Sequence, residues 1–279
     1  MQGANFGMVF TFPFTGYAPW SIAFSSLHTI CAIIFAVVFI SDLKKEYANS
    51  KLPISSKFII WGLVFMGISN LVPFAIGPVS SMYGKSDAYY FLINSYLHFQ
   101  YNGWFTFALL GIILRFLEIQ GIDTNHTKLR RGLTLKLISV FPVLLIAILS
   151  PETDDLWFYI TLLAASIQLI GLTLILQFIW LHKHLWSMQL NKWVIRLMTI
   201  AFGSLLLQHF LQILGALPSA VDLLANRQIV IAYLHLVFIG FVTFLSFSQL
   251  IILGFFKQGK CLHIGLMIFS MGFLLPNLF

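Results

Sequence analysis

Apolar runs of about 20 residues recur along almost the whole chain, and this length matches the hydrocarbon thickness of a lipid bilayer. Hydrophobic residues make up 59% of the 279 residues and charged residues only 9%, whereas about 25% of residues are charged in soluble domains. We therefore predict an all-α integral membrane protein with one transmembrane helical domain over residues 1–279. The eight predicted spans are residues 16–41, 57–79, 88–115, 132–150, 156–181, 193–217, 228–256 and 261–279.

The basic residues predict the orientation of these spans. Except for Lys85 and Arg227, every lysine and arginine is assigned to loops on one side of the membrane, and Lys136 is counted among them. By the positive-inside rule, that side is cytoplasmic and the N-terminus faces out. Because the basic residues do not form one patch, nucleic acid is excluded as a partner, and membrane lipid is the expected one.

The acidic residues restrict the chemistry of the interior. All nine lie in loops or at the ends of predicted helices, and no lysine or arginine is expected in the middle of a span. A membrane zinc hydrolase needs a base beside its metal-bound water, and proton-coupled transporters carry buried carboxylates. Both classes are therefore disfavoured.

One segment occurs twice in related form. "YLHFQYNGWFTF" (residues 96–107) and "YLHLVFIGFVTF" (residues 233–244) share Tyr-Leu-His, a glycine and a final Thr-Phe at the same offsets. The two copies open the third and seventh predicted spans, which run in the same direction. The match predicts a parallel internal repeat of four helices, with units that start near residues 88 and 228 and a second unit that is incomplete.

Histidines in four spans are the candidate cofactor ligands. A helical rise of 1.5 Å per residue places all four roughly 11–17 Å from the outer helix ends, in one layer. A polar side chain is costly in lipid and marks a site or an interhelical hydrogen bond, and two neutral imidazoles suit haem b. The candidates are His98, His235, His209 and His28, with His98 and His235 as the metal ligands. Neighbouring side chains expected to orient them or contact the cofactor are Asn94, Gln100, Tyr101, Asn102, Trp104, Gln208, Gln212 and Tyr233.

The recurring histidine-bearing spans, with "GYAPWSIAFSSLH" and "YLHFQYNGWF", resemble subunit I of the haem-copper oxidase and nitric oxide reductase superfamily and bacterial NnrS-like membrane proteins. The resemblance implies a partial chain of a larger bundle in the bacterial inner membrane. It also implies haem b, a redox partner or further membrane subunits, and a role in electron transfer or in handling nitric oxide or oxygen.

The chain departs from that superfamily where copper would bind. The span at residues 132–150 lacks the paired histidines that the family carries there, and "YLHLVF" supplies His235 alone. Copper is therefore not expected, and an enzyme of this kind would be an oxidoreductase without a complete copper centre. Two alternatives stay open: a structural or assembly subunit without catalysis, and a channel or transporter for a small neutral solute. The residues that would line the channel are Asn94, Gln100, Asn102, Gln208 and Gln212.

Overall fold

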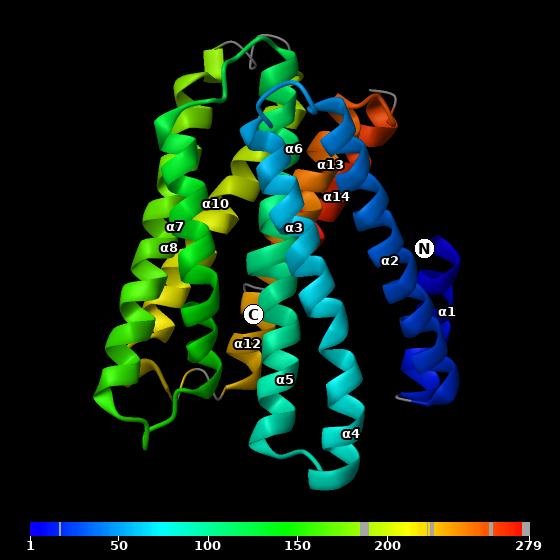
Figure 1. Cartoon of the computed structure of the whole chain (residues 1–279), viewed down its shortest axis with the longest axis vertical. Helices are drawn as coiled ribbons and strands as arrows, with labels where there is room; N and C mark the ends of the chain where they lie inside the picture. Colours follow the sequence, from blue (N-terminus) through cyan, green and yellow to red (C-terminus); the bar gives the residue numbers. More distant parts are fainter. Residues whose placement is uncertain (17, 185–189, 222, 224–225, 257–258, 275–279) are drawn as a thin grey trace. The chain divides into compact units, whose positions relative to one another are not determined.

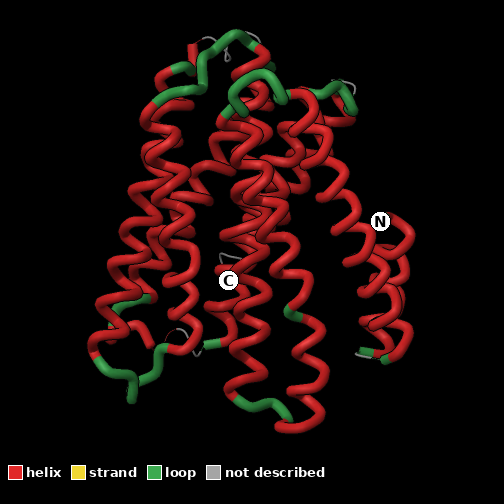
Figure 2. Tube along the Cα trace, in the orientation of Figure 1, coloured by secondary structure: helices red, strands yellow, loops and turns green. Residues whose placement is uncertain are grey.

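The computed structural model is built from helices, and its described part contains no β-strand (Figures 1 and 2). It describes the chain except for residues 17, 185–189, 222, 224–225, 257–258 and 275–279. The predicted all-α class is confirmed. The α-helices are α1 (Gln2–Thr15), α2 (Pro19–Glu46), α3 (Ile54–Leu71), α4 (Pro73–Tyr83), α5 (Asp87–His98), α6 (Thr106–Ile119), α7 (Thr127–Val143), α8 (Asp155–Leu181), α10 (Lys192–Gly215), α12 (Arg227–His235), α13 (Phe244–Ile252) and α14 (Lys260–Leu274).

Other helical turns extend or connect these helices. Two π-helices, η1 (Phe99–Phe105) and η4 (Leu236–Thr243), continue α5 into α6 and α12 into α13. Two 3₁₀ turns, η2 (Leu144–Ile148) and η3 (Pro218–Ala220), follow α7 and α10. Because the π-helices leave the helical path unbroken, residues 87–119 and 227–252 each form one long helix.

Among the described residues, seven helices are long and apolar enough to cross a membrane, which fits a protein embedded in lipid. They coincide closely with the first seven predicted spans. The eighth predicted span forms α14, whose described apolar part is shorter than a full membrane crossing. The helix α1 was not predicted, because its apolar stretch lies next to the longer run of α2 and contains Pro13.

Contacts divide the chain into two compact units, residues 1–108 and residues 109–279. In the first unit, α3 packs against η1 through aromatic rings. The Phe65 ring stacks on Phe99 with centroids 6.1 Å apart and lies 5.3 Å from the Phe107 ring. Val72 and Pro73 break the second span into α3 and α4, because proline cannot donate the backbone hydrogen bond that a continuous helix needs.

In the second unit, α7 and α8 pack side by side along their length (Figure 1). Glycines allow the approach: a Cβ on Gly171 would lie 3.1 Å from the Gly132 carbonyl oxygen and 3.2 Å from the Lys136 backbone nitrogen. The helix α10 packs against α8, η4 and α13. These pairings put the inner faces of α7, α8 and α10 into one helical core.

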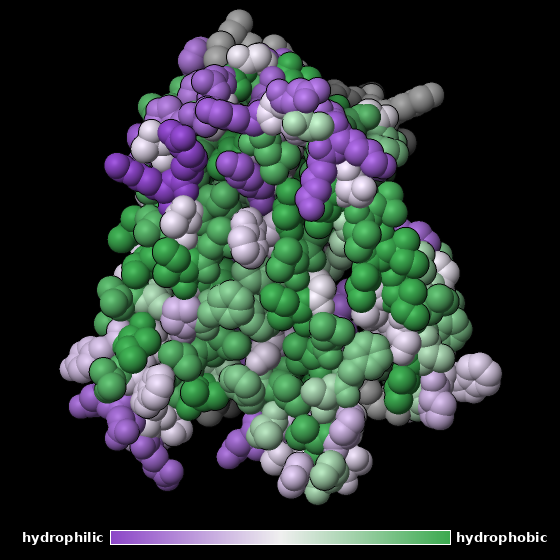
Figure 3. Space-filling view, viewed as in Figure 1, coloured by the Kyte–Doolittle hydropathy of each residue, from purple (hydrophilic) through white to green (hydrophobic). Residues whose placement is uncertain are grey.

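The surface pattern agrees with a lipid environment. On the face shown in Figure 3, hydrophobic residues cover the middle of the α7–α8 pair, and hydrophilic residues gather at its ends. The helix α2 buries only Ser21, Thr29 and Ala32 among its 28 residues and exposes large apolar side chains over the rest. In water such exposure would be unfavourable, whereas acyl chains cover it at no cost.

Candidate functional site

Both copies of the repeated motif enter a π-helix directly after their histidine. His98 is the last residue of α5 and leads into η1, and His235 is the last residue of α12 and leads into η4. π-Helices are rare and occur frequently at functional sites. The backbone thus distinguishes the same two segments that the sequence match does.

A threonine supports each π-helix. Thr106 Oγ1 donates to the carbonyl oxygen of Tyr101 at 2.6 Å, and Thr243 Oγ1 donates to that of Phe238 at 2.8 Å. Both hydrogen bonds reach back five residues, the spacing of the π-helix, and the two threonines hold the same position in the two copies. The shared threonine therefore has a local structural role.

The shared glycine lets a second helix come close. A Cβ on Gly103 would lie 2.6 Å from the Phe65 side chain of α3, and one on Gly240 would lie 2.6 Å from Ser204 Oγ of α10. Contacts this short require glycine, since real Cβ atoms need more room. Each π-helix is thereby packed against another long helix of its own unit.

His98 lies in a dry, aromatic environment. Its side chain is 4% exposed, and its ring meets the Phe99 and Tyr101 rings edge-on. Its Nδ1 atom is 3.1 Å from Nδ2 of the fully buried Asn102, one turn further on. In this arrangement the Asn102 amide donates to Nδ1, so that Nε2 of the neutral ring carries the proton.

Asn102 controls which nitrogen of His98 could bind a metal. With the amide turned by 180°, its oxygen would accept from an Nδ1–H group and leave the Nε2 lone pair for a ligand. Metal-binding histidines are normally held by such a second hydrogen bond. The Asn102 amide can therefore hold the His98 ring in either tautomer.

The other candidate histidines have different surroundings. His235 is exposed, although it matches His98 in the motif. His28 in α2 is half-buried, and its Nδ1 is buried with no hydrogen-bond partner among the described residues. His28 and His98 belong to residues 1–108, and His209 and His235 belong to residues 109–279.

His209 is fully buried and both of its ring nitrogens are engaged. Nδ1 lies 2.9 Å from the Leu205 carbonyl oxygen, and Nε2 lies 2.7 Å from Lys136 Nζ. Because a carbonyl only accepts, Nδ1 carries a proton, and Nε2 is then the acceptor of the neutral ring. In this arrangement neither nitrogen has a lone pair available for a metal.

Lys136 corrects the expectation that no lysine lies within a span. It is not a loop residue: it lies near the middle of α7 and is fully buried. The span starts at Thr127 rather than at residue 132, which places Lys136 deeper in the helix than predicted. A lysine at the centre of a membrane helix costs roughly 2.5–3.5 kcal/mol on insertion scales, so its presence there favours a function.

The predicted amide and tyrosine neighbours separate into buried and accessible groups. Gln212 Nε2 donates to Tyr233 Oη at 3.0 Å and ties α10 to α12, and Gln208 is fully buried in α10. Gln100, Tyr101 and Trp104 are half-buried, and Asn94 is exposed. Among these predicted neighbours, Asn102, Gln208 and Gln212 are the buried ones.

The described residues contain no group of three or more His, Cys, Asp or Glu side chains that could hold a metal ion. A haem held by two histidines needs no such group. The hydrogen bonds of the histidines do bear on which two could serve as haem ligands. They disfavour His209, whose two ring nitrogens already have protein partners. The remaining candidates are His98, His235 and His28.

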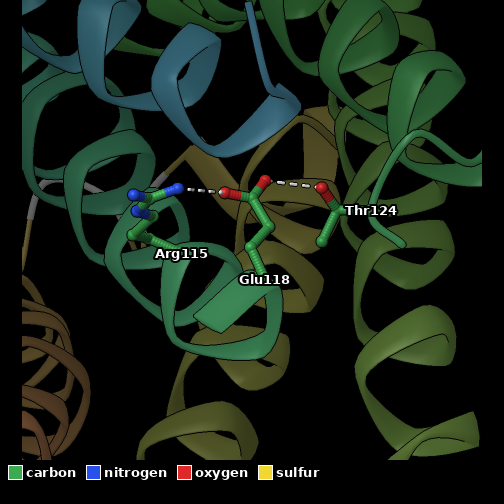
Figure 4. Close-up of polar contacts among 3 residues, drawn as sticks. All are labelled: Arg115, Glu118 and Thr124. Carbon is green, nitrogen blue, oxygen red and sulfur yellow. Dashed lines mark hydrogen bonds and ion pairs between the residues drawn. The ribbon is translucent and has the colours of Figure 1, made fainter. Parts of the chain in front are cut away.

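A polar cluster closes the end of α6. Glu118 accepts a hydrogen bond from Thr124 Oγ1 at 2.5 Å and lies 3.4 Å from an Arg115 guanidinium nitrogen (Figure 4). Thr124 is 3% exposed, so this contact fixes the loop after α6. Glu118 sits one residue before the helix end, as expected for the acidic residues.

Sequence reasoning missed Lys136 as a buried residue and did not consider Gln168, which is fully buried in α8. A local signal existed for Lys136, since "GLTLKLISV" continues a helical pattern through the lysine. For Gln168, the flanking apolar residues show that it lies inside a span. Whether its side chain faces lipid or another helix depends on tertiary packing and could not be predicted.

Comparison with known proteins gives no match: no family model, curated protein or solved structure is significantly similar to this chain.

Proposed function

We propose that this protein binds haem b within a transmembrane helical bundle and serves in electron transfer or in handling a small gas such as nitric oxide or oxygen. The observation that carries the proposal is the repeated segment in which a histidine, His98 or His235, leads into a π-helix. Bound haem would supply one-electron chemistry and a site for a gas ligand. The protein residues would hold and orient the group.

The residues present fit a haem ligand set in part. His98 has the dry, aromatic surroundings and the second hydrogen-bonding group that axial histidines use. His235 supplies an exposed imidazole for a group at the surface of its own unit. Copper is left out of the proposal, because the paired histidines it would need are absent from the sequence of residues 132–150.

The proposal includes the arrangement of the chain in the membrane. The parallel four-helix repeat, the N-terminus outside and the bacterial inner membrane belong to it, as does the resemblance to haem-copper oxidase subunit I and NnrS-like proteins. The alternation of basic loops supports the orientation. The equal placement of His98 and His235 before their π-helices supports the repeat.

An absorption spectrum tests the cofactor. The protein is purified from membranes supplied with haem and reduced with dithionite, and the haem content per chain is measured. We expect haem b bands in the native protein and a loss of haem in His98→Ala or His235→Ala. His209→Gln is the matched control and should keep its haem, because both nitrogens of His209 already have protein partners.

The proposal fails if the native protein is colourless, or if haem remains bound in a variant that lacks both His98 and His235. If His209→Gln alone removes haem while the protein stays folded, then the ligand assignment is wrong.

A second candidate is a transporter or channel for a small neutral solute. The buried amides favour it: Asn102 and Gln168 are both fully buried, and amides in a dry bundle can exchange hydrogen bonds with a passing polar solute. This reading expects a colourless protein whose flux of a solute such as glycerol or urea into liposomes falls in Asn102→Leu. A red protein with unchanged flux in that variant would exclude it.

A further inference from the structure

Lys136 is a buried amine that uses one of its hydrogen-bond donors in the structure. An ammonium group has three N–H donors, and Lys136 makes one hydrogen bond, to His209 Nε2 at 2.7 Å. Among the described residues, no carboxylate forms an ion pair with it. A buried cation without a counter-charge is unstable in a medium of low polarity. As a cation, Lys136 would therefore need a negatively charged acceptor that the ion pairs of the described residues do not supply.

A second buried polar group lies on the facing helix. Gln168 in α8 is fully buried, and neither its Nε2 nor its Oε1 has a hydrogen-bond partner among the described residues. It precedes Gly171 by three residues and so shares a face of α8 with it. Gly171 packs directly on the Lys136 backbone, since its Cβ would lie 3.2 Å from the Lys136 nitrogen. Gln168 thus lies on the face of α8 that packs against α7, one turn from the glycine that meets the Lys136 backbone.

The hydroxyls nearby do not supply the missing acceptor charge. Ser139, the next buried polar residue of α7, donates to the carbonyl oxygens of Leu135 and Lys136 within its own helix. His209 is a neutral acceptor fixed by Leu205. The Lys136 ammonium and the Gln168 amide, on facing helices, each have N–H donors without a hydrogen-bond partner among the described residues.

We propose that Lys136 and Gln168, with His209 fixing the lysine, form a binding site for one small monovalent inorganic anion such as chloride or nitrate. The anion would accept from the ammonium and from the Gln168 amide and would neutralise the lysine. The proposal is independent of haem binding.

Calorimetric titration of the purified full-length protein in detergent tests this site. The probes are sodium nitrate and sodium chloride, with gluconate, a much larger organic anion, replacing them at constant ionic strength. We expect one saturable site per chain. Affinity should fall at least about tenfold in Lys136→Met and about threefold or more in Gln168→Leu. Arg131→Gln, which removes an exposed cation from the same helix, should bind as the native protein does.

The proposal is overturned if the native protein binds neither anion, which would mean that water alone fills the site. It is also overturned if Lys136→Met binds as tightly as the native protein, or if Arg131→Gln weakens binding equally. If Lys136→Met fails to fold, the anion affinities of Lys136→Arg and Gln168→Leu test the site instead. Because arginine keeps the positive charge, Lys136→Arg should bind the anion more tightly than Gln168→Leu does. Equal affinity in the native protein and Gln168→Leu would then count against the site.

Discussion

At the scale of single residues, Lys136 and His209 depend on each other because both are fully buried and the lysine donates to the imidazole. Removing one partner of a buried polar pair leaves the other without a hydrogen bond, which costs its desolvation free energy. Replacing both partners with apolar side chains avoids this cost, because no unsatisfied polar group remains. The pair should therefore be strongly coupled in its effect on stability.

We expect His209→Leu to lower the free energy of unfolding by roughly 3–5 kcal/mol, because the lysine charge loses its partner. Lys136→Met should cost less, about 1–3 kcal/mol, since it leaves a neutral acceptor. The double variant should be more stable than His209→Leu alone. Unfolding in mixtures of dodecyl maltoside and sodium dodecyl sulfate measures this, and simple additivity of the two effects would contradict the coupling.

Tyr233→Phe tests a weaker contact between α10 and α12. The change deletes the hydrogen bond that Gln212 Nε2 donates to Tyr233 Oη at 3.0 Å. Interhelical hydrogen bonds in membrane proteins contribute about 0.6 kcal/mol on average and at most about 1.7 kcal/mol, so the loss of stability should fall in this range. Tyr159→Phe, at an exposed position, is the control and should change nothing in the same unfolding assay.

At the scale of elements, the two π-helices depend on the glycines that allow α3 and α10 to approach them. A methyl group at Gly103 or Gly240 would lie 2.6 Å from Phe65 or Ser204. Close packing leaves no room for such an addition without a shift of the neighbouring helix.

Gly103→Ala and Gly240→Ala should each destabilise the protein by about 1–3 kcal/mol. Gly203→Ala is the control: it lies in α10 with no atom near its added methyl group, and it should be neutral or stabilising by up to about 1 kcal/mol through helix propensity. Adding Ser204→Gly to Gly240→Ala should recover part of the loss. Thermal unfolding in detergent measures these changes in stability. Equal changes in Gly203→Ala and Gly240→Ala would argue against the close contact between Gly240 and Ser204.

At the scale of the whole molecule, the lengths of the seven apolar helices found among the described residues, and of their loops, predict strict alternation across a bilayer. The loop at residues 47–53 and the turn at residues 84–86 follow successive spans and should lie on opposite sides.

Cysteine labelling in sealed vesicles checks this alternation. In a protein with Cys31 and Cys261 replaced by alanine, Ser50→Cys and Lys85→Cys should react with a membrane-impermeant maleimide from opposite faces. Ser50→Cys should react from the cytoplasmic face if the basic loops lie inside. Labelling of both from the same face would contradict the topology.

The fold was predictable as far as it rests on local properties of the chain. A run of about 20 apolar residues forms a helix in lipid wherever its neighbours lie, so seven of the eight spans were found. Pro73 breaks the second span between α3 and α4 through its own backbone chemistry, which is likewise a local property. The eighth span and α1 were harder to predict, because neither is a separate apolar run long enough to cross a membrane.

The sequence by itself determined the membrane class, the positions of the long helices and the motif that His98 and His235 share, since hydrophobic length and residue order are properties of the chain alone. Only the tertiary structure decided which histidine is buried, which nitrogens are engaged and that Lys136 lies inside the bundle. The physical reason is that polar side chains in lipid find partners across helices: Lys136 and His209 are 73 residues apart in the chain and 2.7 Å apart in space. No local pattern encodes such a pair.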